Sequence, residues 1–182
     1  SSAASDVYKR QNIHRFAAKI KGFHKKFKNA PVCAIINRKG CEIMAKQGEA
    51  AYAYFLKGYN CSQSVVAAFA PQLGLSEEMA LRMSAGFGAG IGRMREVCGA
   101  FCGVVTVLSL VYADPADPQD KSRMYALVQE AARLYRARNG GDSIICRELL
   151  AKAGAAPSGG TKAEARTAEY YRKRPCPELC RM

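Results

Sequence analysis

Apolar residues recur at spacings of three and four through most of the chain, which is the period of a helix that buries one face. The pattern predicts helices over residues 42–56, 61–70, 77–86, 97–112, 118–138, 144–152 and 161–171. No segment shows the alternation of apolar and polar residues that is expected of a half-buried strand. The sequence therefore predicts an all-α fold, a compact bundle of about six to seven helices.

Local punctuation residues set the expected ends of these helices. Asn60, Ser76 and Ser143 each precede a helical segment, and their side chains are good acceptors for the first free backbone N–H groups. Pro118 suits the first turn of the helix that follows it. Pro71 and Gly74 are expected to close the helix that starts after Asn60.

The first forty residues differ from the rest of the chain. Within the segment 13–27, one helical face is apolar and lysines surround it. The apolar face consists of Ile13, Phe16, Ile20, Phe23 and Phe27. Such a helix binds a membrane surface or an acidic partner, or it docks on the domain, which we favour because most amphipathic helices face a core. We therefore expect a basic N-terminal arm over residues 1–40, partly disordered or one amphipathic helix, and a helical domain over residues 41–182.

Composition and charge narrow the classes of protein. The 182 residues are 49% hydrophobic and 24% charged, which is typical of a globular protein. The net charge is +13, but residues 1–40 hold ten of the 28 basic residues and one of the 15 acidic ones. A nucleic-acid-binding domain carries its charge on the folded module, so there is no strong case for nucleic acid. Without a secretory signal at residues 1–11 or an apolar run of about 18 residues, we expect a cytoplasmic protein with no transmembrane segment.

Glycine alternates with other residues in the loop GFGAGIG, residues 86–92. No strand is predicted before it and no Lys-Ser/Thr pair follows, so it matches neither the dinucleotide-binding turn nor the P-loop. Four glycines at this spacing indicate instead that the backbone closely approaches either a cofactor or another helix.

Eight cysteines are the most unusual feature of the composition. In a reducing compartment they indicate metal binding or thiol chemistry rather than structural disulfides. Cys61, Cys98 and Cys146 fall at predicted helix starts, where free N–H groups and the helix dipole stabilise a thiolate. Arg93 and Arg95 add positive charge near Cys98. A single free cysteine often only fills a core, but three that share this placement favour a function.

The metal chemistry open to the domain is limited by its ligands. Both histidines, His14 and His24, lie in the N-terminal arm, so a site in the domain would be made of cysteines alone. Four thiolates suit a zinc ion and an iron–sulfur cluster equally well. Cys98 and Cys102 are four residues apart and share a face if helical, as do Cys176 and Cys180.

Five segments in order carry a recognisable pattern. They are GYNCSQSV at residues 58–65, GFGAGIGR at 86–93, EVCGAFCG at 96–103, CRELL at 146–150 and CPEL at 176–179. Together they resemble the C_GCAxxG_C_C family of small, helical, redox-active prokaryotic proteins, over residues 44–182. Family members usually continue with a helix after the last cysteine, whereas this chain ends at Met182.

The resemblance implies a set of four functional cysteines, namely Cys61, Cys98, Cys146 and Cys176. The remaining cysteines lie at a variable motif position, just beyond the last motif, or outside the pattern, namely Cys102, Cys180, Cys33 and Cys41. We expect the four functional thiols to meet, either as catalytic groups in dithiol–disulfide exchange or as ligands of an iron–sulfur cluster or another thiolate-bound metal. The residues expected to shape the cofactor pocket are Gly86, Gly88, Gly90, Gly92, Arg93, Gly99 and Cys102.

Two alternatives stand beside this hypothesis. A structural zinc site with four cysteine ligands explains the thiols without redox chemistry. A non-catalytic binding module would instead use the basic arm. Enzymatic activity, the redox partner and a homo-oligomeric state are left open by the sequence.

Overall fold

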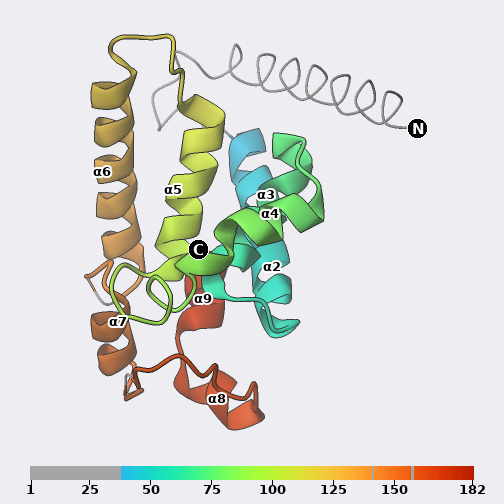
Figure 1. The fold of residues 1–182 in the computed structure, drawn as a ribbon, viewed down its shortest axis with the longest axis vertical. Helices are drawn as coiled ribbons and strands as arrows, with labels where there is room; N and C mark the ends of the chain where they lie inside the picture. The colour runs from blue at the N-terminus through green and yellow to red at the C-terminus, as the bar shows by residue number, and fades with distance from the viewer. Residues whose placement is uncertain (1–37, 141, 157) are drawn as a thin grey trace.

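The computed structural model describes residues 38–140, 142–156 and 158–182, and the backbone of these residues is helical with no strand (Figure 1). The helices are α2 (Arg38–Leu56), α3 (Cys61–Leu73), α4 (Glu77–Ser84), η2 (Ala85–Phe87, a 3₁₀ helix), α5 (Gly99–Tyr112), α6 (Asp120–Arg138), α7 (Cys146–Lys152), α8 (Ala168–Lys173) and α9 (Cys176–Arg181). The all-α prediction is confirmed. The amphipathic segment 13–27 and Cys33 lie outside the described residues.

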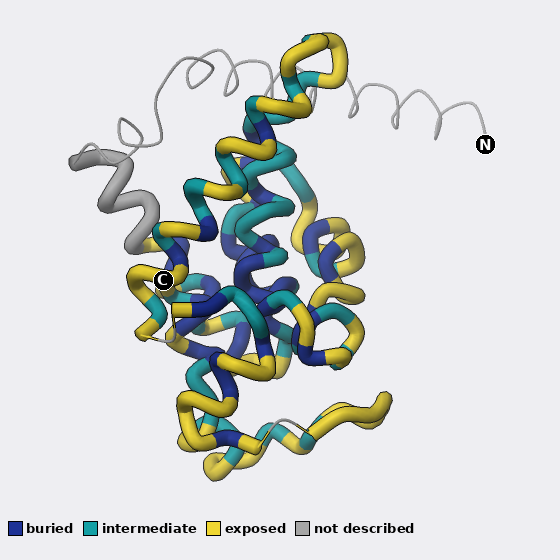
Figure 2. The backbone as a smooth tube through the Cα atoms, turned by 90° about the vertical axis from the view of Figure 1, so that its left-hand side faces the viewer, coloured by how far each residue is buried: buried dark blue, intermediate teal, exposed yellow. Residues whose placement is uncertain are grey.

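Helix α3 lies at the centre of the fold, and α2, α4, α5 and α9 all pack against it (Figure 1). Most of its residues are buried, and many are alanine, serine or valine, so neighbouring helices approach closely. Gly103 of α5 shows how close: a Cβ atom there would lie 2.8 Å from the Cβ of Val65. Figure 2 shows the buried backbone concentrated in the middle of the molecule, with exposed segments towards its ends.

Helices α5 and α6 form a hairpin whose turn is fixed by one arginine (Figure 1). Arg123 pairs with Asp117 at 2.6 Å and with Asp120 at 2.5 Å. Helix α6 begins two residues after Pro118, so the prediction that this proline lies in its first turn was wrong. The hairpin brings Tyr135, near the end of α6, back into the main core.

Two of the three predicted helix caps are confirmed. Asn60 forms a capping box, in which its side chain accepts from the Gln63 N–H at 3.0 Å and the Gln63 side chain accepts from the Asn60 N–H at 3.1 Å. Ser76 caps α4 through the Met79 N–H at 3.1 Å. Ser143 does not cap α7: it bonds the Ile145 N–H, and the helix begins after Ile145 without a side-chain cap.

The ends of two predicted segments need correction. Helix α3 continues through Pro71 to Leu73 and closes at Gly74, which has the left-handed conformation that favours glycine. Only the end of the predicted helix over residues 161–171 is helical. Helix α8 starts at Ala168, where Thr167 caps it. The chain then turns into α9, a second short helix that the apolar pattern did not reveal.

None of the helices in the described part of the chain is long and apolar enough to cross a membrane.

Candidate functional site

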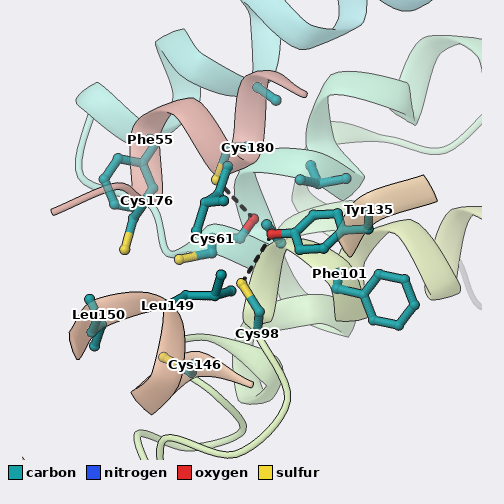
Figure 3. Packing of buried hydrophobic residues seen from close by; sticks show 14 of the residues in the cluster. Phe55, Cys61, Cys98, Phe101, Tyr135, Cys146, Leu149, Leu150, Cys176 and Cys180 are labelled. Carbon is teal, nitrogen blue, oxygen red and sulfur yellow. Dashed lines mark hydrogen bonds between the residues drawn. The ribbon is translucent and has the colours of Figure 1, made fainter. Parts of the chain in front are cut away.

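Four cysteines that the sequence singled out lie at the starts of four different helices and line one small cavity of about 40 Å³. They are Cys61 at the first residue of α3, Cys98 at the N-cap of α5, Cys146 at the first residue of α7 and Cys176 at the first residue of α9. All four are buried and none is in a disulfide. Figure 3 shows them around Leu149, with their side chains coming from different directions.

A short antiparallel bridge holds two of these helix starts together. Val97 and Ile145 pair, the Cys98 N–H donates to the Ile144 carbonyl at 2.7 Å, and the Cys146 N–H donates to the Glu96 carbonyl at 2.6 Å. The bridge satisfies N–H groups that a helix start otherwise leaves free. It fixes the start of α5 against the start of α7, and so fixes Cys98 relative to Cys146.

The glycine-rich loop before Cys98 is wound in the left-handed sense. Residues 89–93 all have positive φ, between 55° and 76°, and Arg95 has φ of 63°. Left-handed backbone costs non-glycine residues roughly 1–2 kcal/mol each, and Ile91 is β-branched as well. Backbone bonds close the loop on itself, including one from the Gly92 N–H to the Gly86 carbonyl at 2.8 Å. A strained, over-determined backbone of this kind is characteristic of functional sites.

The predicted close approach of the glycine loop is to helix starts. A Cβ at Gly88 would lie 2.3 Å from the Asn60 side chain, and one at Gly90 would lie 2.7 Å from the Cys146 Cβ. At Gly99 the added atom would meet the Phe87 carbonyl at 2.9 Å and the Cys61 Cβ at 3.2 Å. The loop therefore sets the spacing between α3, α5 and α7 around the cavity.

Cys61 is the thiol whose pKa is lowered well below its ordinary value. The largest cause is side-chain hydrogen bonding with Cys176, followed by hydrogen bonding with Cys180, and together they outweigh burial. Arg166 contributes a favourable positive charge. The Cys180 Sγ also lies 3.7 Å from the Cys61 carbonyl oxygen. Cys61 is thus the thiol poised to ionise, and thiolates are the nucleophilic form of cysteine.

The other motif cysteines are held as neutral thiols. Burial and the charge of Cys61 raise the pKa of Cys98 to about 12, and its Sγ lies 3.3 Å from the buried Tyr135 hydroxyl. Burial also raises the pKa of Cys146, against the opposing charge of Arg95. The pKa of Cys176 is raised by its hydrogen bond to Cys61 and by burial. The sequence predicted thiolates at Cys98 and Cys146, but their raised pKa values favour neutral thiols. At both positions desolvation outweighs the helix dipole.

A network of arginines around one carboxylate borders the cavity. Glu164 accepts from Arg93 at 2.8 Å and Arg95 at 3.1 Å through one oxygen, and from Arg174 at 2.6 Å through the other. Although burial acts to raise it, the pKa of Glu164 is held at about 2 by the hydrogen bonds from Arg93, Ser158 and Arg174. The network ties the loop before Cys98 to the segment before α8.

Arg166 occupies an aromatic stack beside Cys61. Its guanidinium carbon lies 4.4 Å from the Phe55 ring centroid and 4.7 Å from that of Tyr170. One terminal nitrogen donates to the Tyr59 carbonyl at 3.1 Å. The other, Nη1, is buried and has no hydrogen-bond partner within the described ranges.

The cavity includes some of the predicted cofactor-binding residues and leaves out others. Gly99 lines it, together with Ala89 of the glycine loop. The residues that lie outside its wall are Gly86, Gly88, Gly90, Gly92, Arg93 and Cys102. Cys102 is only partly buried, and its sulfur lies 3.8 Å from the Val97 carbonyl oxygen. These residues position the wall rather than form it.

The thiols do not converge as a metal site would require. Among the described residues, no group of three or more His, Cys, Asp or Glu side chains is arranged so that it could hold a metal ion. Leu149 lines the same cavity as the four cysteines and appears among them in Figure 3. The arrangement therefore fits pairwise thiol chemistry better than shared ligation of one ion.

Sequence reasoning missed several members of the site. Four residues contact the motif thiols or place a positive charge near them, namely Cys180, Tyr135, Arg166 and Arg174. The spacing of four residues between Cys176 and Cys180 was a usable signal, since both side chains reach Cys61. The other three have no signal in the motif, because their contacts with it are made by folding.

The fold and the site together define a class: a small all-α protein with buried free thiols at the starts of its helices. The sequence model of the C_GCAxxG_C_C family, described as "Putative redox-active protein (C_GCAxxG_C_C)", matches residues 59–182. The chain therefore belongs to this family, as the motifs predicted. No curated protein and no solved structure matches the chain.

Proposed function

We propose that this protein is a thiol–disulfide redox protein in which Cys61 is the attacking thiolate and Cys176 is the resolving thiol. The observation that carries the proposal is the position of Cys61 and Cys176 on the wall of one cavity, where hydrogen bonding with Cys176 lowers the pKa of Cys61. A lowered pKa supplies the nucleophile, and an adjacent thiol supplies the second sulfur that a disulfide needs.

The reaction balances with a disulfide as the oxidant. The Cys61 thiolate attacks one sulfur of a substrate disulfide, which breaks the S–S bond and releases one thiolate. Cys176 gives its proton to that thiolate and attacks the Cys61 sulfur, which releases the second substrate sulfur as a thiolate that takes up a proton from solvent. The products are a Cys61–Cys176 disulfide and two substrate thiols, so two electrons pass from the protein to the substrate. A dithiol reductant reverses the protein's half of the exchange.

The test is to equilibrate the protein in buffers of defined dithiothreitol redox ratio, quench with acid, alkylate, and map disulfides by peptide mass spectrometry. We expect one two-electron transition and a Cys61–Cys176 linkage. Cys61→Ser and Cys176→Ser should each abolish it, whereas Cys102→Ser, which alters a thiol outside the cavity wall, should leave it unchanged. A protein that forms no intramolecular disulfide under any ratio overturns the proposal.

A second candidate is ligation of a metal or iron–sulfur cluster by the same four cysteines, favoured by their position on one cavity. Because no three of the described thiols are arranged to hold one metal ion, this function requires the cysteines to come closer together than they lie here. Metal analysis of anaerobically purified protein separates the cases. Stoichiometric iron with visible absorbance supports a cluster, stoichiometric zinc without colour supports a structural site, and neither is expected for dithiol exchange.

A further inference from the structure

The wall of the cysteine cavity carries an excess of positive charge. Arg95, Arg166 and Arg174 line it, and within the described part of the chain its lining includes no aspartate or glutamate. The carboxylate of the arginine network is Glu164, which Arg95 and Arg174 share with Arg93. One carboxylate thus serves three guanidiniums, and Arg166 forms no ion pair with it. Because unpaired buried charge is costly, we expect this excess of positive charge to attract an anion into the cavity.

Arg166 is the guanidinium with capacity to bind one. Packing between the Phe55 and Tyr170 rings fixes its plane. Its Nη2 is used by the Tyr59 carbonyl, and its buried Nη1 has no acceptor among the residues described. A buried donor without an acceptor is destabilising, so we expect Nη1 to have a partner, which can be an ordered water or an anion. Guanidinium groups match the planar pair of oxygens in a carboxylate or an inorganic oxyanion.

The position of this arginine relates it to the reactive thiol. Arg166 and Cys61 line the same cavity and interact electrostatically. The cavity has room for a group of a few atoms, about 40 Å³, and not for a large substrate. An anionic group held here would place an adjoining sulfur-reactive atom beside Cys61.

Resting on the function proposed above, we propose that the cavity selects small substrates that carry an oxyanion group, a carboxylate or an inorganic oxyanion, bound through Arg166 beside Cys61. The substrate class is therefore a small anionic molecule rather than a neutral one. Arg95 and Arg174 contribute attraction across the cavity, and Arg166 contributes the specific contact.

A pair of alkylating reagents tests this selectivity directly. Iodoacetate carries a carboxylate, and iodoacetamide has nearly the same shape without the charge. The ratio of their rates at one cysteine is independent of how much of that cysteine is thiolate, because both reagents attack the same thiolate. Peptide-resolved mass spectrometry gives the ratio at Cys61 and, in the same sample, at Cys102, which lies outside the cavity wall. We expect the iodoacetate-to-iodoacetamide ratio at Cys61 to exceed that at Cys102 by about tenfold, the effect of one charge-assisted contact.

Three variants assign the effect to the proposed residues. Arg166→Gln should bring the ratio at Cys61 down to that at Cys102, and Arg166→Lys should restore part of it through charge alone. Glu164→Gln should raise the ratio, because it removes the negative charge that Arg95 and Arg174 share. Helical circular dichroism and an unchanged ratio at Cys102 check that each variant is folded. If Arg166→Gln does not fold, the wild-type ratio and the opposite shift in Glu164→Gln still decide the question.

A further arm separates the two sources of the oxyanion. Inorganic phosphate that slows iodoacetamide attack at Cys61 but not at Cys102 supports a free inorganic oxyanion. A high iodoacetate ratio that phosphate does not affect supports a carboxylate on an organic molecule. Equal ratios at Cys61 and Cys102 in the wild-type protein overturn the inference. Disulfide mapping does not depend on this result, so failure of anion selectivity and failure of the redox proposal are distinguishable.

Discussion

The glycine loop offers a test of how tightly the site is built, through two alanine substitutions two residues apart. Gly90 and Gly92 both have positive φ, 76° and 55°, so alanine is strained at either position. Their surroundings differ. At Gly90 an added Cβ would lie 2.7 Å from the Cys146 Cβ and 2.8 Å from the backbone of Arg95 and Glu96. At Gly92 nothing lies within 4 Å.

The magnitudes follow from these two environments. The left-handed conformation costs alanine roughly 1–2 kcal/mol at both positions. At Gly90 the crowding of fixed backbone and of the Cys146 Cβ adds the cost of an overpacked site, about 1–3 kcal/mol. Gly92→Ala should therefore lower the free energy of unfolding by about 1–2 kcal/mol, and Gly90→Ala by about 2–5 kcal/mol.

Urea denaturation under reducing conditions, followed by circular dichroism, measures both values on the full chain. A second readout is the rate of alkylation at Cys146, which should rise in Gly90→Ala because the start of α7 is pushed away, and stay unchanged in Gly92→Ala. If the two variants have equal stability, the loop does not press on Cys146, and its role as the spacer between helix starts is refuted.

Three further predictions rest on other contacts of the site. Asn60→Ala removes the capping box of α3 and a bond to the Ala85 carbonyl, and should cost about 1–2 kcal/mol in the free energy of unfolding, measured by urea denaturation. Burial raises the pKa of Cys98 to about 12 in the folded protein, against an ordinary 9.0. Its contribution to stability is therefore present below pH 9 and is lost as pH rises towards 12. Between pH 8 and about 10.5, the wild-type protein should lose more free energy of unfolding than Cys98→Ser. Glu164 has a folded pKa of about 2 against 4.5, so its contribution is present above pH 4.5 and is lost as pH falls towards 2; Glu164→Gln should flatten the acid limb of the stability–pH curve, and an unchanged limb would contradict the arginine network.

Features that the sequence predicted well depend on neighbours in the chain. Asn60 and Ser76 were recognisable because a cap bonds residues three positions away. The position of Cys61 at a helix start followed from the Asn60 cap, whereas those of Cys98 and Cys146 followed from the apolar pattern, since neither helix has a side-chain cap. The Ser143 prediction was wrong because its hydroxyl accepts from the Ile145 N–H and donates to Glu148. These bonds form a turn before α7 and do not cap the helix.

Features that the sequence did not reveal depend on distant contacts. Cys180 meets Cys61 across 119 residues, and Arg166 meets Tyr59 across 107. The left-handed loop was foreseen only as a close approach, since nothing local requires Ala89 or Ile91 to adopt positive φ. Tertiary contacts impose that conformation, and no periodicity in the sequence reports it.

Each of the four motif cysteines lies at the start of its own helix, yet only Cys61 has a lowered pKa. The cause of this difference also concerns the proposed substrate. A helix dipole contributes typically about 0.3–1 kcal/mol, whereas burial shifts a pKa by up to several units. The pKa of Cys61 is lowered despite burial, because hydrogen bonding with Cys176 and Cys180 and the charge of Arg166 favour its thiolate. The guanidiniums of Arg95, Arg166 and Arg174 line the cavity, and Arg93, outside its wall, shares Glu164 with two of them; against these four positive charges stand two negative groups, Cys61 and Glu164. The thiolate alone therefore leaves two positive charges unbalanced. We therefore expect the proposed anionic substrate to bind in this cavity more tightly than a neutral one, because its charge offsets part of the positive charge around the thiols.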